Sequence, residues 1–135
     1  MESYEILEHV TDLEIRAFGK TKEELFSNML RGMFESVKAK GKRQKEKVVR
    51  EIKIESSDQE SLLVDFLSEA LAQSDINNEA YFEAKFDKLA DKELEGKFFG
   101  CPVESFAAEI KAVTYHGLEI KQVNGQWQAT VLFDI

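Results

Sequence analysis

The chain has 135 residues, of which 43% are hydrophobic and 33% are charged, a balance that excludes an intrinsically disordered chain. This length suits one domain over residues 1–135, able to bury roughly two thirds of its unfolded surface without cross-links. The net charge of −8 disfavours broad electrostatic attachment to nucleic acid or to an anionic membrane, so any contact with RNA should be indirect or local.

The first predicted elements are two strands and a helix. Residues 4–9 and 13–19 show the short apolar and polar alternation of strands. Thr21 and Glu24 then have the spacing of a capping box, and the apolar residues that follow recur at helical intervals. This stripe consists of Leu25, Phe26, Met29, Leu30, Met33, Phe34 and Val37. We predict a helix that starts after Thr21 and ends near Gly41.

The pattern then repeats. Residues 47–56 alternate as a strand, and Ser57 and Glu60 have capping-box spacing before a second helix. The apolar positions of that helix are Leu62, Leu63, Phe66, Leu67, Ala70 and Leu71. Polar residues 73–79 are predicted to be a connection. An internal duplication stays open, because any two amphipathic helices align as well as these two do.

Strands dominate the remaining chain. Residues 80–86 and 92–99 are predicted strands joined by a turn at 87–91. The segment 105–113 is ambiguous, since its apolar spacing fits a helix while the residues after it can be extended. Two final strands flank Asn124 and Gly125, the strongest short hairpin signal.

The single cysteine and the N-terminal composition indicate a compartment. Cys101 has no second cysteine with which to form an intrachain disulfide or a thiolate zinc cluster. The first ten residues lack the basic residues of a signal peptide, and no segment approaches the roughly 18 apolar residues of a membrane span. We therefore expect a soluble, cytoplasmic protein that does not act at a membrane.

Few residues suggest covalent catalysis. The "GKT" at residues 19–21 lacks the upstream glycine of a nucleotide-binding loop. Cys101 with His116 as its base would make a nucleophile, but a lone cysteine beside a proline is more often a small buried apolar residue. The sequence favours the buried cysteine.

One basic run stands out in this acidic chain. Residues 38–47, "KAKGKRQKEK", could bind an RNA backbone or an acidic partner. They are equally what a solvated helix end and loop would contain, and cations there also suit the helix dipole. We favour the solvated loop.

Three segments carry a family resemblance: "EHVTDLEI" near the start, "EIKAVTYHGL" at 109–118 and the closing "WQATVLFDI". Together they resemble the archease family over essentially the whole chain. The most specific parts of this resemblance are "IKAVTYH" and the aspartate before the last residue. The family usually reads His-Thr-Ala-Asp where this chain has His9, Val10, Thr11 and Asp12, so histidine and aspartate remain three apart.

The resemblance implies a fold and an activity. The fold would be an α/β (α+β) archease fold of two packed strand, helix, strand, strand modules with mixed or antiparallel sheet and two main helices. The activity would be that of a protein cofactor and not an enzyme. Proteins of this family assist the GTP-dependent RNA ligase of the RtcB type by promoting its guanylylation and multiple turnover in tRNA splicing. An acidic surface would suit docking to a basic RNA-binding ligase.

The resemblance also implies a metal site. Asp12, Asp134 and the terminal residue, Ile135, would bind a divalent cation, the last through its backbone carboxylate. Oxygen donors of this kind suit Ca²⁺, and alternatively Mg²⁺ or Mn²⁺, better than Zn²⁺. Spacing alone, without the resemblance, would favour Asp134 and the terminus as solvated groups at a sheet edge.

Three further residues are candidates for the same cleft. His9, Lys111 and His116 lie in the two most diagnostic segments, and the histidines are also compatible with purely structural roles.

Two other functions stay open. One is a small metal-dependent hydrolase in which Asp12 and Asp134 hold the ion and His116 transfers protons. The other is a binding module or chaperone that needs no metal.

Overall fold

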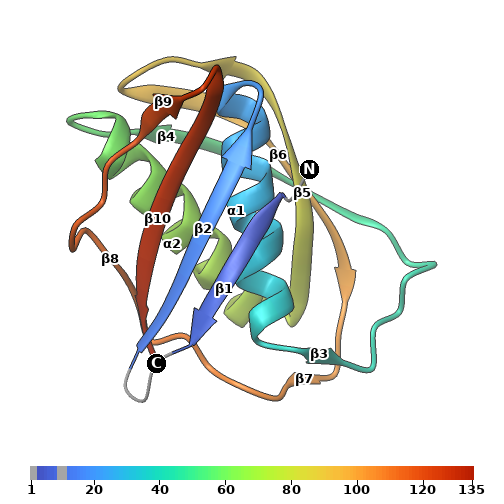
Figure 1. Cartoon of the computed structure of the whole chain (residues 1–135). Helices are drawn as coiled ribbons and strands as arrows, with labels where there is room; N and C mark the ends of the chain where they lie inside the picture. Colours follow the sequence, from blue (N-terminus) through green and yellow to red (C-terminus); the bar gives the residue numbers. More distant parts are fainter. Residues whose placement is uncertain (1–2, 9–11) are drawn as a thin grey trace.

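A five-stranded antiparallel sheet combines strands from the N-terminal and the C-terminal parts of the chain (Figure 1). The computed structural model describes residues 3–8 and 12–135. Strand order in this sheet is β1-β2-β10-β8, and β9 also pairs with β10. The strands are β1 (Tyr4–Glu8), β2 (Asp12–Gly19), β8 (Ala112–Thr114), β9 (Lys121–Val123) and β10 (Gln126–Asp134). Strand β10 lies in the middle, so the latest part of the sequence becomes an interior strand.

The centre of the sequence builds a second antiparallel sheet. Its order is β4-β6-β5, formed by β4 (Val48–Glu55), β5 (Glu79–Leu89) and β6 (Glu93–Pro102). A short two-stranded ladder pairs β3 (Ala39–Lys40) with β7 (Ser105–Phe106). Together with two helices, these antiparallel sheets confirm the α/β class expected from the sequence.

Helix α1 (Lys22–Ser36) starts where the sequence predicted and ends earlier. Its N-cap is Thr21, whose hydroxyl accepts the Glu24 N–H at 3.1 Å. The predicted end near Gly41 is wrong, because the chain turns at Lys38, which has a left-handed φ of 49°. From there it enters β3, and the N–H of Ala107 donates to the carbonyl of Val37 at 3.0 Å.

Helix α2 (Gln59–Asn77) is longer than predicted. Its cap is Asp58 and not Ser57, since the Asp58 carboxylate accepts the Ser61 N–H at 2.7 Å. The predicted connection at 73–79 is mostly the last turns of this helix, which ends in a left-handed Asn78. Among the described residues, no helix combines the length and the apolar content that a membrane crossing would require.

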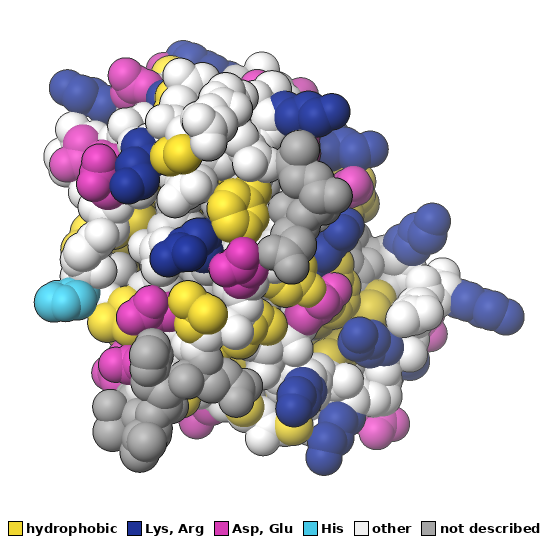
Figure 2. Space-filling model, viewed as in Figure 1, with side chains coloured by type: hydrophobic (Ala, Val, Ile, Leu, Met, Phe, Trp, Pro, Cys, Tyr) yellow, Lys and Arg dark blue, Asp and Glu magenta, His cyan; other side chains and the backbone are white. Residues whose placement is uncertain are grey.

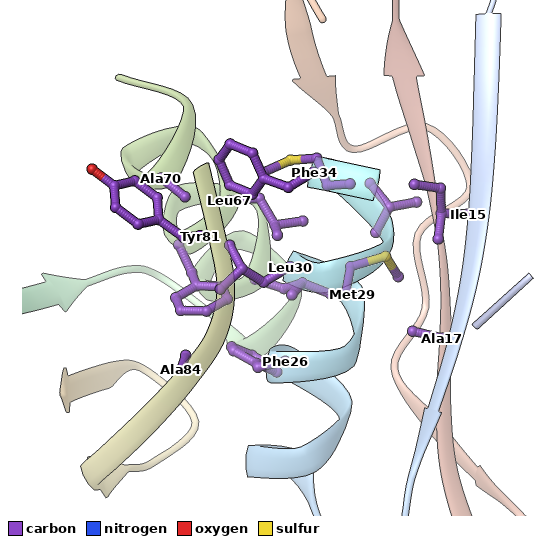
Figure 3. Close-up of a cluster of buried hydrophobic side chains, with 14 of the residues drawn as sticks. Ile15, Ala17, Phe26, Met29, Leu30, Phe34, Leu67, Ala70, Tyr81 and Ala84 are labelled. Atoms are coloured by element: carbon purple, nitrogen blue, oxygen red, sulfur yellow. The ribbon is translucent and has the colours of Figure 1, made fainter. Parts of the chain in front are cut away.

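The core is organised around α1, which lies between the two sheets (Figure 3). On one side Met29 points toward Ile15 of β2, and on the other Phe26 and Leu30 point toward β5 and α2. All seven residues of the predicted stripe are buried. A Cβ on Gly32 would meet Tyr4 and Ile15 at 3.0 and 3.1 Å, so glycine allows the helix to approach the first sheet closely.

The strands confirm some predictions in detail and correct others. The final hairpin is present: Val123 pairs with Gln126, and Asn124 and Gly125 have φ of 54° and 76°, as a primed two-residue turn requires. The turn predicted at 87–91 is shorter, because β5 continues to Leu89. The ambiguous segment 105–113 is mainly irregular and contains β7 and the start of β8.

One partly buried ionic network links strands of the second sheet. Glu79 has an exposed fraction of 4%, and its carboxylate accepts two hydrogen bonds from Arg50, at 2.9 and 2.7 Å. The Tyr81 hydroxyl donates a third, at 2.7 Å. The Arg50 guanidinium lowers the pKa of Glu79. Burial, and then the Glu79 carboxylate, raise the pKa of Tyr81.

We expect Glu79→Gln to lower the free energy of unfolding at neutral pH by about 1–3 kcal/mol, since it leaves Arg50 without its charged partner. A carboxyl whose folded pKa is depressed stabilises the fold above its unfolded pKa of about 4.3, and this stabilisation is lost as pH falls through the folded pKa. The difference between native and variant proteins should therefore shrink in acid. Urea unfolding at a series of pH values measures it, with Glu51→Gln, an exposed residue on β4, as the matched control. A constant difference down to the acid limit would contradict the assignment.

Candidate functional site

Two aspartates meet where β2 begins and β10 ends. Asp12 and Asp134 are register partners in this antiparallel pair. Directly opposed residues point to the same face with Cβ atoms roughly 4.5–5.5 Å apart, and like charges there destabilise the pair. The sheet register therefore places two carboxylates together at one end of the sheet.

Asp12 also faces a small pocket of about 240 Å³. The pocket is lined by Asp12, Leu13, Ser36, Val37, Ala108, Glu109, Ile110 and Ile135. Oδ1 of Asp12 is buried and, within the part of the chain that the structure describes, has no hydrogen-bond partner. A buried polar atom is normally satisfied, and an exception calls for an explanation such as an ion. The last residue, Ile135, lies against the same pocket.

Asp134 is exposed and is held through its backbone. Its carbonyl accepts the N–H of Lys111 at 2.7 Å, which ties the strand end to the segment before β8. Lys111 lines a neighbouring pocket of about 790 Å³ between that segment and α2. The two pockets share Val37, Ala108, Glu109 and Ile110. The backbone of Lys111 therefore lies beside the end of β10, and a role for its side chain stays a prediction.

The donor set suits a hard cation. Within residues 3–8 and 12–135, no group of three His, Cys, Asp or Glu side chains is placed to hold a metal ion. The predicted ligand set does not require three such side chains, because it consists of two carboxylate side chains and the backbone carboxylate of Ile135. Only oxygen atoms would be offered, as Ca²⁺, Mg²⁺ and Mn²⁺ prefer. The unpartnered Asp12 oxygen is the observation that fits such an ion.

None of the other candidate residues is shown to line the pocket of Asp12 and Ile135. His9 lies outside the described residues. His116 is an exposed turn residue after β8 and does not line the pocket of Asp12 and Ile135. Cys101 is buried at the end of β6, and burial raises the pKa of its thiol. The expectation of a buried structural cysteine is confirmed.

Two polar residues of the pocket were missed from the sequence. Ser36 is the last residue of α1, and Glu109 belongs to the segment whose structure was ambiguous. Neither has a sequence signal, because α1 was predicted to continue beyond Ser36 and no periodicity assigns Glu109 to a face. A correct end for α1 would have placed Ser36 near the start of β2.

Comparisons with known proteins place the chain among close relatives. The Archease protein family matches residues 4–135. The protein archease of Methanosarcina barkeri is 37% identical over 140 residues, which cover 98% of this chain and 95% of that protein. The protein archease of Pyrococcus abyssi is 34% identical over 143 residues, covering 100% of both chains.

Solved structures agree with the fold. The solution structure of Methanobacterium thermoautotrophicum protein 1598 has a TM-score of 0.75 and 30% identity and covers 100% of both chains. The crystal structure of a Thermotoga maritima archease, described as a possible chaperone, has a TM-score of 0.69 and 20% identity and covers 100% of this chain and 99% of that one. At that lower identity the second likeness shows the fold alone.

Because Asp12 and Asp134 repel each other, we expect Asp12→Asn to raise the free energy of unfolding slightly, by about 0.2–1 kcal/mol, when divalent ions are removed by a chelator. Asp134→Asn should have a similar effect, and the double variant should gain less than the sum, because either change removes the repulsion. Chemical unfolding at low ionic strength gives the free energy of unfolding of the native chain, the two single variants and the double variant. Losses of stability in both single variants would contradict the opposed arrangement.

Proposed function

Since the chain belongs to the archease family, we propose that it is an activator of a GTP-dependent RNA ligase of the RtcB type. It would promote guanylylation of the ligase and repeated turnover in tRNA splicing, as a protein cofactor in the cytoplasm and not as the catalyst. The observation that carries this proposal is a family match that runs from residue 4 to residue 135. The net charge of −8 supports docking to a basic, RNA-binding partner.

We propose further that Asp12, Asp134 and the backbone carboxylate of Ile135 hold one divalent cation, Ca²⁺ in preference to Mg²⁺ or Mn²⁺. When bound, the cation supplies positive charge that offsets the repulsion between these carboxylates. Asp12 Oδ1 is already desolvated and unpartnered by the described residues. Three protein groups leave coordination positions for water or for a group of the ligase.

The residues around the carboxylates support a docking surface. The Lys111 N–H holds the carbonyl of Asp134, so the end of β10 and the segment before β8 form one unit. The Lys111 side chain is exposed and lines the neighbouring pocket, which shares Glu109 with the pocket of Asp12. We propose that Lys111 contacts an anionic group of the ligase or its nucleotide. His9 and His116 remain candidates for the same surface.

Addition of this protein in substoichiometric amount should raise the number of RNA joining events per molecule of a cognate ligase several-fold, while the protein alone joins nothing. Asp12→Asn should lose most of the activation because it removes a proposed ligand. Asp87→Asn, the same change at an exposed site on β5, should activate normally. The measurement is multiple-turnover ligation of a labelled RNA. Unchanged turnover with the native protein would refute the activator function.

Two separate measurements identify the alternatives. Hydrolysis of a model phosphoester by the isolated protein would indicate a metal-dependent hydrolase. Suppression of aggregation of an unrelated unfolded client, without divalent ions, would indicate a general chaperone. Guanylylation of the ligase, followed with labelled GTP, separates the activator from both.

Saturating Ca²⁺ should raise the thermal unfolding midpoint of the native chain, since a ligand at a hundred times its Kd contributes about 2.7 kcal/mol. Asp12→Asn should respond much less. A chain extended by two residues after Ile135 should also respond less, because the terminal carboxylate becomes a neutral amide. The same extension before Met1 is the control. Calorimetric titration with Ca²⁺, Mg²⁺ and Mn²⁺ gives the affinities, and equal affinities in all four proteins would show that the carboxylates are ordinary surface charge.

A further inference from the structure

Another hollow lies on the β4-β6-β5 sheet. It shares no lining residue with the carboxylate pocket, the name we give to the pocket lined by Asp12 and Ile135. Its volume of about 710 Å³ is within the range of ligand-binding clefts, roughly 300–1,000 Å³. The end of α1, the loop after β3 and all three strands of the sheet contribute to it. Three lysines and two aromatic residues distinguish its lining: Lys42, Lys47, Lys85, Phe82 and Phe99. We call it the lysine hollow.

The strand register explains why aromatic and apolar groups face solvent here. Phe99 of β6 is flanked by Val49 of β4 and Glu83 of β5. The neighbouring Phe98 faces the core and is fully buried, so Phe99 points to the opposite face. Val49 beside it has an exposed fraction of 49%. A β-bulge between Tyr81 and Glu83 adds Phe82 to the same hollow.

Cations lie over both rings. The Lys42 ammonium is 4.8 Å from the centre of the Phe82 ring, and the Lys85 ammonium is 5.3 Å from that of Phe99. In the described part of the chain, neither of these lysines nor Lys47 forms an ion pair, in contrast to lysines elsewhere such as Lys53. Figure 2 shows Lys and Arg side chains gathered at the lower right, where β3 and the loop after it lie in Figure 1.

We propose that this hollow binds single-stranded RNA. The three lysines would contact phosphates, and a base would stack on the ring of Phe99. A base on an aromatic side chain strengthens binding about 5- to 150-fold, whereas an exposed cation–π contact contributes only about 2- to 5-fold. A base can therefore displace Lys85 from the ring with a net gain, and the released ammonium becomes available to a phosphate.

The rings favour RNA over an acidic protein segment. An acidic peptide would satisfy the lysines but would leave both aromatic faces unused. Two carboxylates also line the hollow, and Glu35 among them is already engaged as acceptor for the Tyr4 hydroxyl. The site is local, so it is compatible with a net charge of −8 that disfavours general attachment to nucleic acid. This inference goes beyond the activator function, because it requires neither the ligase nor the cation.

Fluorescence anisotropy with a labelled single-stranded oligouridylate tests the proposal on the full chain. Binding at low salt should weaken as salt rises, with a slope of log K against log salt of about −2 for three phosphate contacts on a single strand. A duplex RNA of the same length should bind more weakly, because its bases are already stacked. No binding of the oligouridylate at low salt would overturn the proposal.

Matched variants assign the binding to this hollow. Changing Lys42, Lys47 and Lys85 to Gln should flatten the salt slope and weaken binding more than tenfold. Changing Lys20, Lys92 and Lys121 to Gln, which alters net charge equally at exposed positions outside the hollow, should leave most of the affinity. Equal losses in the two triple variants would show attraction by overall charge and overturn the site.

Phe99→Leu separates stacking from charge. It keeps an apolar side chain at a half-buried position outside the core cluster, so the variant should fold, and circular dichroism checks this. Oligouridylate affinity should fall at least fivefold. If Phe99→Leu binds RNA normally while a polyglutamate peptide binds the native protein and loses affinity in the hollow triple variant, the site is an anion site for acidic protein and the RNA proposal is wrong.

Discussion

The structure depends on the burial of one helix between two sheets. The apolar stripe of α1 is two residues wide at each turn, so it offers one row to β2 and another to β5 and α2. Burial of such a helix removes apolar area from water on both sides, at roughly 25 cal/mol per Å². The two sheets have no common strand, and α1 packs against both of them within one core.

Both proposed functional regions follow from this arrangement. The carboxylate pocket forms where α1 ends against the beginning of β2, since Ser36 and Val37 line it together with Asp12. The lysine hollow includes Glu35 of the same last turn and lies on the other sheet. The end of α1 is thus shared by two sites of opposite charge. A shift of this helix along its axis would change both, although they share no side chain.

The sequence predicted correctly those features that depend on residues close together in the chain. Thr21 as a cap, the apolar stripe of α1 and the Asn124–Gly125 turn are decided within a few residues, and all three are present. The end of α1 was not predictable, because it depends on Ala107 hydrogen bonding to Val37 across 70 residues. The segment 105–113 is likewise held by Asp134 and not by its own periodicity. Asp12 and Asp134 were proposed as ligands only through a family resemblance. The lysine hollow was not predicted, because Lys42 and Lys85 line it from different elements and their distance along the sequence does not indicate this.

The central position of β10 has a consequence for how the chain acquires its structure during synthesis. The segment β4–α2–β5–β6 is contiguous and can pair its strands as it emerges from the ribosome. The first sheet cannot, because β2 pairs along its whole length with residues 127–134, more than a hundred positions later. Pairings of such sequence separation form slowly, and N-terminal parts generally fold first. Until β10 arrives, β2 lacks its strand partner on one edge, and the buried side chains of Ala129, Val131 and Phe133 are missing from the core. The nascent chain therefore passes through a stage with an incomplete core that is closed only by its last strand.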